Sequence, residues 1–204
     1  ALGLALGRLR STPMDYTTSL SPAHRAGAND FIAFVAASPT PHHCVAEAVR
    51  RLEDANFNNA TPTAGRDAAG FRARAGSLIA WRTSKKPGPV RVVTAHTDSP
   101  NLRIKPRPDG VSAGVRQFGV EVYGGALVNS WLDRDLGLAG QVVCRKPKKA
   151  RQEQSTDVVS HLVTIDRPVL RIPQLAIHLD REINTKGLQL NPQTHLKPMW
   201  GFAS

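Results

Sequence analysis

The residues of this sequence with the clearest chemistry are His96 and Asp98, in the segment His96-Thr97-Asp98. The Val-rich run 89–96 ends at this segment, and ligands of open α/β sheets bind where strands end. Because residues i and i+2 of an extended segment point to the same side, both side chains would face one pocket. A neutral imidazole is a good zinc ligand, and a carboxylate beside it can orient the ring. The pattern predicts a metal-binding pair; the alternative, a loop histidine beside a capping aspartate, is left open by spacing alone.

A second group that could do chemistry is the carboxylate pair Asp133 and Asp135, on either side of Arg134. Two carboxylates can bridge metals or share a proton. Most paired charges are structural, however, so we favour a network of Asp and Arg that fixes strands.

The elements that must position these residues begin with two helices. Residues 26–37 carry apolar positions at helical spacing, with Asn29 or Asp30 as the predicted cap. A second helix is predicted over about 42–55. Its apolar face would be formed by Val45, Val49 and Leu52.

Strands follow the polar, turn-rich stretch 56–70. The unbroken Val-rich run 89–96 is typical of a strand that is buried on both faces. Pro108-Asp109-Gly110 predicts a turn, and the final stretch 196–204 contains no closing element. The other strand-like runs are 77–81, 119–123, 138–144, 157–165 and 169–172. Two helices and strands, followed by a block of strands, predict an α/β layer that passes into a β-rich module.

The composition is that of an ordinary soluble globular protein, with 204 residues, 41% of them hydrophobic and 21% charged. No apolar run approaches the roughly 20 residues that a membrane-spanning helix needs, so we expect no membrane partner. Cys44 and Cys144 form neither a C-x-x-C pair nor a disulfide framework, which predicts a reducing, cytoplasmic location.

The formal net charge of +11 is concentrated most densely in residues 145–151, between two strand-like runs, where a hairpin loop is expected. A basic surface of this kind can bind nucleic acid. No aromatic residues are interleaved there to stack bases, so we favour a solvated basic surface and expect no nucleic-acid partner.

Five segments carry a resemblance to a known family. They are 38–47 (SPTPHHCVAE), 96–106 (HTDSPNLRIKP), 123–140 (from YGGA to WLDRDLGLAG), 167–179 (RPVLRIPQLAIHL) and 194–196 (THL). In this order they resemble segments of the aspartyl aminopeptidases, the zinc metalloaminopeptidases of family M18.

The resemblance implies an α/β fold class: part of a zinc-aminopeptidase catalytic domain, followed by a β-rich oligomerisation domain, with the C-terminal half missing. On this basis residues 1–13 are an unplaced lead-in, residues 14–106 form the N-terminal part of the catalytic domain, and residues 107–204 form an incomplete oligomerisation domain. Asp133 and Asp135 then fall in the oligomerisation domain, which also favours their structural interpretation.

The resemblance also implies roles for three residues. In the family, the histidine of the H-T-D-S-P segment is a zinc ligand of a two-metal centre, and its aspartate supports that centre; these are His96 and Asp98 here. The histidine of the L-A-I-H segment, His178 here, reaches towards the active site of a neighbouring subunit as a zinc ligand or a substrate-facing group. A strand-end histidine with a structural hydrogen bond is the alternative for His178.

The implied activity is metal-dependent removal of N-terminal residues, with a preference for Asp or Glu, by a homo-oligomer that acts on peptides. Two Zn²⁺ ions would hold a bridging water, lower its pKa and polarise the scissile carbonyl. A glutamate general base would take the proton of that water.

This sequence departs from the family pattern in lacking a Leu-Asp-Asn segment and an adjacent pair of glutamates. The glutamates it has are Glu47, Glu53, Glu121, Glu153 and Glu182. We therefore expect the missing ligands beyond Ser204, and we expect the chain alone to fold poorly and to be inactive. The alternative function is a non-catalytic module, derived from such an enzyme, that associates with copies of itself; a basic nucleic-acid binder is the third hypothesis.

Overall fold

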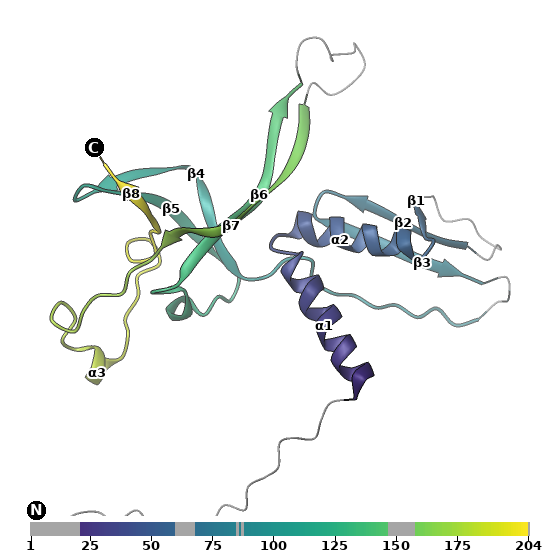
Figure 1. Ribbon diagram of the computed structural model, residues 1–204, viewed down its shortest axis with the longest axis horizontal. Coiled ribbons are helices and arrows are strands. Elements are labelled where there is room, and N and C mark those ends of the chain that lie inside the picture. Colours follow the sequence, from purple (N-terminus) through teal and green to yellow (C-terminus); the bar gives the residue numbers. More distant parts are fainter. Residues whose placement is uncertain (1–20, 60–67, 85, 87, 147–157, 204) are drawn as a thin grey trace, which may run out of the picture.

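The computed structural model describes residues 21–59, 68–84, 86, 88–146 and 158–203. Within them, helices α1 and α2 accompany a 3-stranded sheet of order β1-β2-β3, and a 5-stranded sheet of order β4-β5-β8-β7-β6 follows (Figure 1). The extended segment 88–100 joins the two sheets. The structure is thus of mixed α/β class, as predicted.

Helix α1 (Pro22–Ala36) begins earlier than predicted. The Ser21 side chain accepts a hydrogen bond from a backbone N–H of the first turn, and Pro22 occupies a position where a missing N–H costs nothing. Asn29 and Asp30 therefore lie inside the helix, and the prediction that one of them caps it was wrong. The helix start is signalled by Ser21-Pro22, which lies upstream of the apolar spacing on which the prediction was based.

Helix α2 (Pro41–Asp54) agrees with the predicted 42–55 to within one residue at each end. Thr40 caps the helix by accepting a hydrogen bond from a first-turn N–H. Cys44 and Val45 are buried, and the helix packs against β2 and β3.

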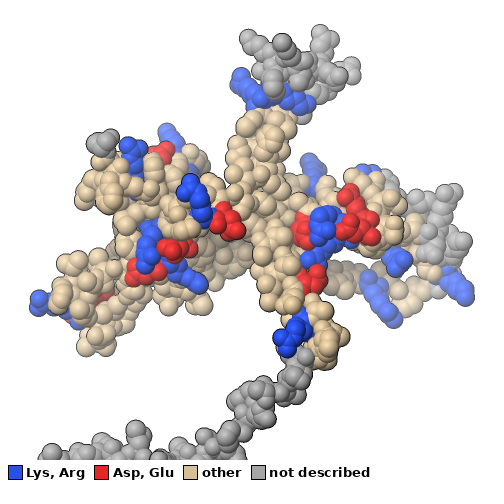
Figure 2. All heavy atoms as spheres, viewed as in Figure 1, with Lys and Arg blue, Asp and Glu red and all other residues tan. Residues whose placement is uncertain are grey.

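An ion-pair cluster on α2 joins this helix to α1. Arg51 binds Glu47 at 2.7 Å and Asp30 of α1 at 2.9 Å, and Arg50 binds Glu47 and Asp54 at 2.7 Å. Hydrogen bonds from Arg50 and Arg51 lower the pKa of Glu47 to about 2. Acidic and basic atoms adjoin one another over this part of the surface (Figure 2).

The 3-stranded sheet consists of β1 (Asn58–Asn59), β2 (Ala68–Arg74) and β3 (Ser77–Thr83). β2 and β3 form an antiparallel hairpin, and β1 pairs with β2 in parallel. β3 confirms the strand predicted at 77–81. Phe71 of β2 is among the most buried side chains, at 2% exposure.

β1 and the start of β2 lie within 56–70, where only turns were predicted. Alanine and glycine are weak strand formers, so β2 has little signal of its own. Its conformation depends on pairing with β3, where Gly70 lies opposite Trp81 and under the indole ring.

The Val-rich run 89–96 does not form the predicted buried strand. The whole segment 88–100 is outside any strand, and Val90, Val92 and Val93 are 88%, 77% and 94% exposed. A strand needs hydrogen-bonded neighbours, and none of the strands in the described ranges pairs with this segment. Val-rich runs are typical of a sheet interior, but the described residues provide no such interior around this segment, so the predicted burial was wrong as well.

The 5-stranded sheet opens with a hairpin of β4 (Asn101–Ser112) and β5 (Val115–Tyr123). The turn is at Ala113 and Gly114, whose φ values of 49° and 73° suit a two-residue hairpin turn. The turn predicted at Pro108-Asp109-Gly110 was wrong. These residues lie within β4, where a register shift between Ile104 and Asp109 accommodates prolines that cannot pair regularly.

A second hairpin, of β6 (Asp135–Arg145) and β7 (Val158–Arg171), projects from the body of the sheet (Figure 1). It confirms the hairpin expected on either side of the basic run 145–151, of which residues 147–151 lie outside the described ranges. β7 is one continuous strand where two were predicted.

The sheet is completed by β8 (Met199–Phe202), which pairs with both β5 and β7. The prediction that 196–204 contains no closing element was therefore wrong; strand pairing across long sequence separations has no local signal. The core against this sheet comprises Val120, Leu132, Ile172 and Leu196. A 3-10 turn, η1 (Val128–Trp131), and a short helix, α3 (Ile183–Lys186), complete the described elements.

His43 of helix α2 links this helix to β7 of the 5-stranded sheet. Its Nδ1 lies 2.7 Å from the Thr40 hydroxyl and its Nε2 lies 3.0 Å from the Thr164 hydroxyl of β7. Burial, assisted by the neighbouring His42, lowers the pKa of His43. A neutral imidazole has one donor and one acceptor, which suits two hydroxyl partners.

No helix in the described ranges is both long and apolar enough to cross a membrane.

Candidate metal-ligand site

The structure brings together His96 and Asp98, as predicted, and adds Tyr123. His96 Nδ1 lies 2.8 Å from Asp98 Oδ1, and the Tyr123 hydroxyl donates a hydrogen bond to Asp98 Oδ2. An ionised carboxylate only accepts hydrogen bonds, so Nδ1 carries the imidazole proton. The lone pair of His96 is then on Nε2, and the His96 side chain is 89% exposed.

The hydrogen bonds set the charge of the site. Those from Tyr123 and, to a smaller extent, His96 lower the pKa of Asp98. Asp98 in turn raises the pKa of Tyr123. At neutral pH the site therefore contains an ionised carboxylate and a protonated phenol.

The 3-stranded sheet holds one side of the segment. The Thr97 hydroxyl donates a 2.6 Å hydrogen bond to the carbonyl of Gly76, in the turn between β2 and β3. A Cβ on Gly76 would lie 2.9 Å from Cβ of Pro41, the first residue of α2, so this turn packs directly on the helix. Helix, hairpin and segment are thus fixed relative to one another at Thr97.

The 5-stranded sheet holds the other side through Tyr123, the last residue of β5. Gly124, which follows it, has a φ of 71°, and a Cβ there would lie 3.4 Å from Pro100. A glycine is therefore suited to turn the chain beside the residues that follow Asp98.

Arg103 fixes the ring of Tyr123. Its guanidinium lies 3.4 Å from the centre of the ring. Tyr123 pairs with Asn101 and Glu121 pairs with Arg103, so Arg103 and Tyr123 are diagonal neighbours on one face of the β4–β5 hairpin.

The pair fits a zinc ligand with its orienting carboxylate. Zinc-bound histidines commonly donate the other ring N–H to a carboxylate, which fixes the tautomer. A protein zinc site needs at least three protein ligands, and in the described ranges no three His, Cys, Asp or Glu residues lie together so that they could hold a metal. The described residues therefore supply one part of a ligand set.

His178 is not brought to this pair. It lies in an exposed turn of the loop between β7 and α3. This loop and the segment 88–100 lie well apart in Figure 1. Its role as a metal ligand stays a prediction.

Asp133 and Asp135 form the structural network that we favoured, with Arg171 as the central arginine. Arg171 lies 3.0 Å from Asp135 and 3.6 Å from Asp133. Asp133 also accepts a hydrogen bond from the Gln174 backbone. The adjacent Arg134 instead lies 3.5 Å from a backbone carbonyl, that of Ser130.

Sequence reasoning missed Tyr123 as a member of the site. The available signal was its place immediately before Gly124-Gly125, because a tyrosine at the end of a strand and before a tight turn can face a neighbouring segment. The contact between Thr97 and Gly76 had no comparable signal.

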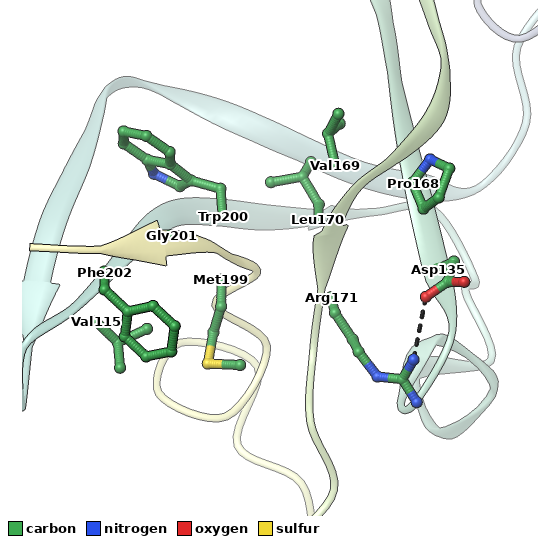
Figure 3. Close-up of a pocket in the computed structure, with 10 residues that line it drawn as sticks. All are labelled: Val115, Asp135, Pro168, Val169, Leu170, Arg171, Met199, Trp200, Gly201 and Phe202. Atoms are coloured by element: carbon green, nitrogen blue, oxygen red, sulfur yellow. Dashed lines mark hydrogen bonds and ion pairs between the residues drawn. The ribbon is translucent and has the colours of Figure 1, made fainter.

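Two hollows lie elsewhere on the 5-stranded sheet and its loops. The first, of about 310 Å³, is shallow and lies where β7 and β8 meet, with Arg171 and Asp135 at its rim (Figure 3). The second, of about 460 Å³, has walls that include Leu132, Leu175 and His195. Neither is lined by His96, Asp98 or His178, so neither belongs to the candidate site.

The chain is similar to known proteins over most of its length. It is 50% identical over 184 residues to a probable M18 family aminopeptidase 2 of Streptomyces avermitilis, covering 87% of this chain and 40% of that protein. It is 44% identical over 182 residues to a protein of the same name from Mycobacterium leprae, covering 86% and 41%. The chain thus spans about 40% of the length of the curated relatives it matches.

Solved structures agree with this assignment. A structure of the Ape4 and Nbr1 complex matches with a TM-score of 0.75 and 37% identity, over 87% of this chain and 34% of that chain. The structure of Chaetomium thermophilum mApe1 matches with a TM-score of 0.72 and 27% identity, over 88% and 41%. Residues 34–204 match the family model described as aminopeptidase I zinc metalloprotease (M18). The resemblance seen in the sequence is confirmed, and the chain belongs to the M18 family of zinc aminopeptidases.

Proposed function

We propose that this chain supplies a zinc ligand, His96, to an aminopeptidase that removes N-terminal residues, preferentially Asp and Glu, from peptides. One observation carries the proposal: His96 donates its Nδ1 proton to Asp98 and leaves Nε2 open, in a chain of the M18 family. The acidic preference rests on the resemblance to aspartyl aminopeptidases.

His96 would hold zinc through Nε2, and Asp98 would keep the proton on Nδ1 while balancing part of the positive charge. Bound zinc would lower the pKa of a water and polarise the scissile carbonyl. Asp98 acts through His96, so its contribution is to keep the ring oriented and electron-rich.

His178 would serve the same reaction from another copy of the chain. Its exposed loop makes it available to a neighbouring subunit rather than to His96 of its own chain. We propose a homo-oligomer on this basis, with residues 107–204 as the oligomerisation domain and residues 14–106 as the start of the catalytic domain.

The chain by itself would not turn over substrate, because its described residues supply too few ligands for a two-metal centre. We also propose that it works in a reducing, cytoplasmic setting, which both free thiols, of Cys44 and Cys144, would tolerate.

A hybrid enzyme tests the proposal. The corresponding segment of the Streptomyces avermitilis relative is replaced by residues 21–204 of this chain, and hydrolysis of aspartyl, glutamyl and leucyl anilides is measured with added Zn²⁺. We expect turnover that favours the acidic substrates and falls at least about 100-fold in the His96→Ala hybrid, since a metal ligand is lost. The unaltered relative is the positive control. A folded hybrid whose activity is unchanged by His96→Ala would contradict the proposal.

The second candidate function is a non-catalytic module that associates with copies of itself. The projecting hairpin of β6 and β7 favours it, because Val142, Val143, Val158 and Leu162 are 41–57% exposed there. Sedimentation of the purified chain, with Val143→Lys as the interface variant, measures association. Assembly of the chain, lost in that variant, together with a zinc-loaded hybrid that shows no hydrolysis would favour this candidate over the enzyme.

A further inference from the structure

The segment that carries His96 has no strand pairing of its own. Residues 88–100 lie outside the sheets, and such segments have more conformational freedom than paired strands. A metal ligand must nevertheless be held in a narrow range of orientations. The contacts that restrain this segment therefore decide how well His96 is placed.

Hydrogen bonds tie this segment to both sheets. Thr97 points to the 3-stranded sheet and binds the Gly76 carbonyl. Asp98 is bound at both carboxylate oxygens, by His96 at Oδ1 and by the Tyr123 hydroxyl at Oδ2. Among these bonds, the one from the Tyr123 hydroxyl links the Asp98 carboxylate, which holds the imidazole, to a sheet.

Tyr123 is itself well anchored. It is the last residue of β5 and pairs with Asn101 of β4, and its ring is covered by Arg103 at 3.4 Å. The left-handed turn at Gly124 directs the chain away immediately after it. The Tyr123 hydroxyl thus reaches from the paired strand β5 to Asp98 in the unpaired segment 88–100.

We propose that Tyr123 is a positioning residue of the metal site: its hydroxyl fixes Asp98 so that the His96 ring keeps its proton on Nδ1 and presents Nε2. The use of Nε2 for zinc rests on the proposed function, whereas the effect on the ring does not. The hydrogen bond from Tyr123 to Asp98 thereby restrains the orientation of the His96 ring relative to the 5-stranded sheet.

Nitrogen NMR of the metal-free, ¹⁵N-labelled chain tests this inference at about pH 8, where histidine side chains are mostly neutral. The wild-type chain is expected to show His96 as one tautomer, with the proton on Nδ1. In Tyr123→Phe the two tautomers are expected to become comparably populated. Ser130→Ala, which removes a hydroxyl bound to the Leu127 carbonyl, is the control and is expected to leave His96 unchanged.

Zinc affinity of the hybrid enzyme, which supplies the remaining ligands, is the second readout and is measured by competition with a chromophoric chelator. Loss of a residue that orients a metal ligand costs about 10–100-fold in metal affinity. Tyr123 contacts Asp98 and not His96 itself, so a smaller fall in zinc affinity, about 3–10-fold, is expected in Tyr123→Phe. Arg103→Met removes the guanidinium that covers the Tyr123 ring but keeps the Tyr123 hydroxyl. It is expected to raise the population of the minor His96 tautomer, but by less than Tyr123→Phe does. It also provides a test if Tyr123→Phe does not fold.

The two proposals fail separately. Unchanged His96 tautomers in both variants would overturn the role of Tyr123, whatever the chain does with zinc. Tautomers that respond to Tyr123→Phe, together with a hybrid enzyme whose zinc affinity is unaffected by His96→Ala, would support the positioning role and contradict the proposed function.

Discussion

At the scale of single residues, the property of His96 that matters is which ring nitrogen carries the proton. Asp98 determines this, because an ionised carboxylate accepts the Nδ1 proton and cannot donate one. An amide in its place has a donor as well as an acceptor, and it carries no charge to balance a metal.

Asp98→Asn should therefore weaken zinc binding by about 10–100-fold while leaving the fold intact. Competition with a chelator measures the zinc affinity of the hybrid enzyme, which supplies the remaining ligands, and circular dichroism checks its fold. Asp109→Asn, at an exposed carboxylate of β4, is the matched control and should change the affinity little. Equal affinities of wild type and Asp98→Asn would show that the carboxylate does not act on the ligand.

His43 should make the stability of the protein depend on pH. Burial lowers its pKa below the ordinary value of 6.5, so the unfolded chain binds a proton at a higher pH than the folded chain does. The contribution of His43 is fully present above that ordinary value and is lost as the pH falls below it. Urea denaturation between about pH 7 and pH 5 should show a smaller loss of unfolding free energy in His43→Gln than in the wild type. An identical loss in both, with His24→Gln as the control, would contradict this.

At this scale the sequence predicted the pairing of His96 with Asp98, because residues i and i+2 share a side in an extended segment. It did not predict Tyr123, which is 25 residues away from Asp98 and meets it only after the 5-stranded sheet has formed. Local spacing contains no information on such a contact.

At the scale of elements, the hairpin of β2 and β3 depends on a close approach between its strands. A Cβ on Gly70 would lie 2.7 Å from the Trp81 ring, so the indole covers the glycine directly. Gly70→Ala should therefore force the ring to move and destabilise the protein by about 1–3 kcal/mol.

Thermal or urea denaturation measures the change in the free energy of unfolding. Gly140→Ala is the matched control, because Gly140 also lies in a strand and a Cβ there meets nothing within 4 Å. An equal loss of unfolding free energy in Gly70→Ala and Gly140→Ala would show that Trp81 does not constrain β2.

Elements with local signals were predicted well. Helix α2 has a Thr-Pro start and an apolar face, and β3 has a β-type run, so both were located within a few residues. The Val-rich run 89–96 was misassigned because strand formation depends on partners, and β8 was missed because its partners lie far away in the sequence. Turn signals at Pro108–Gly110 were overridden by the pairing of β4 with β5.

At the scale of the whole molecule, the 5-stranded sheet is the larger body and carries the core cluster of Val120, Leu132, Ile172 and Leu196. Ile172 is fully buried, so Ile172→Ala should destabilise the protein by about 2–5 kcal/mol. Val142→Ala, at a valine that is 47% exposed on the projecting hairpin, should cost less than about 1 kcal/mol. If Ile172→Ala and Val142→Ala shift the denaturation curve equally, Ile172 is not a core residue and the account of the core is contradicted.

The central claim at this scale is that two sheets clamp one segment so that His96 offers Nε2 to zinc. The most direct test is the zinc content of the hybrid enzyme, in which residues 21–204 of this chain replace the corresponding segment of the Streptomyces avermitilis relative. Elemental analysis after equilibration with Zn²⁺ compares the hybrid with its His96→Ala variant. The predicted result is zinc bound by the hybrid and reduced in His96→Ala. Equal zinc in the two would contradict the claim, because the metal would then be held without His96.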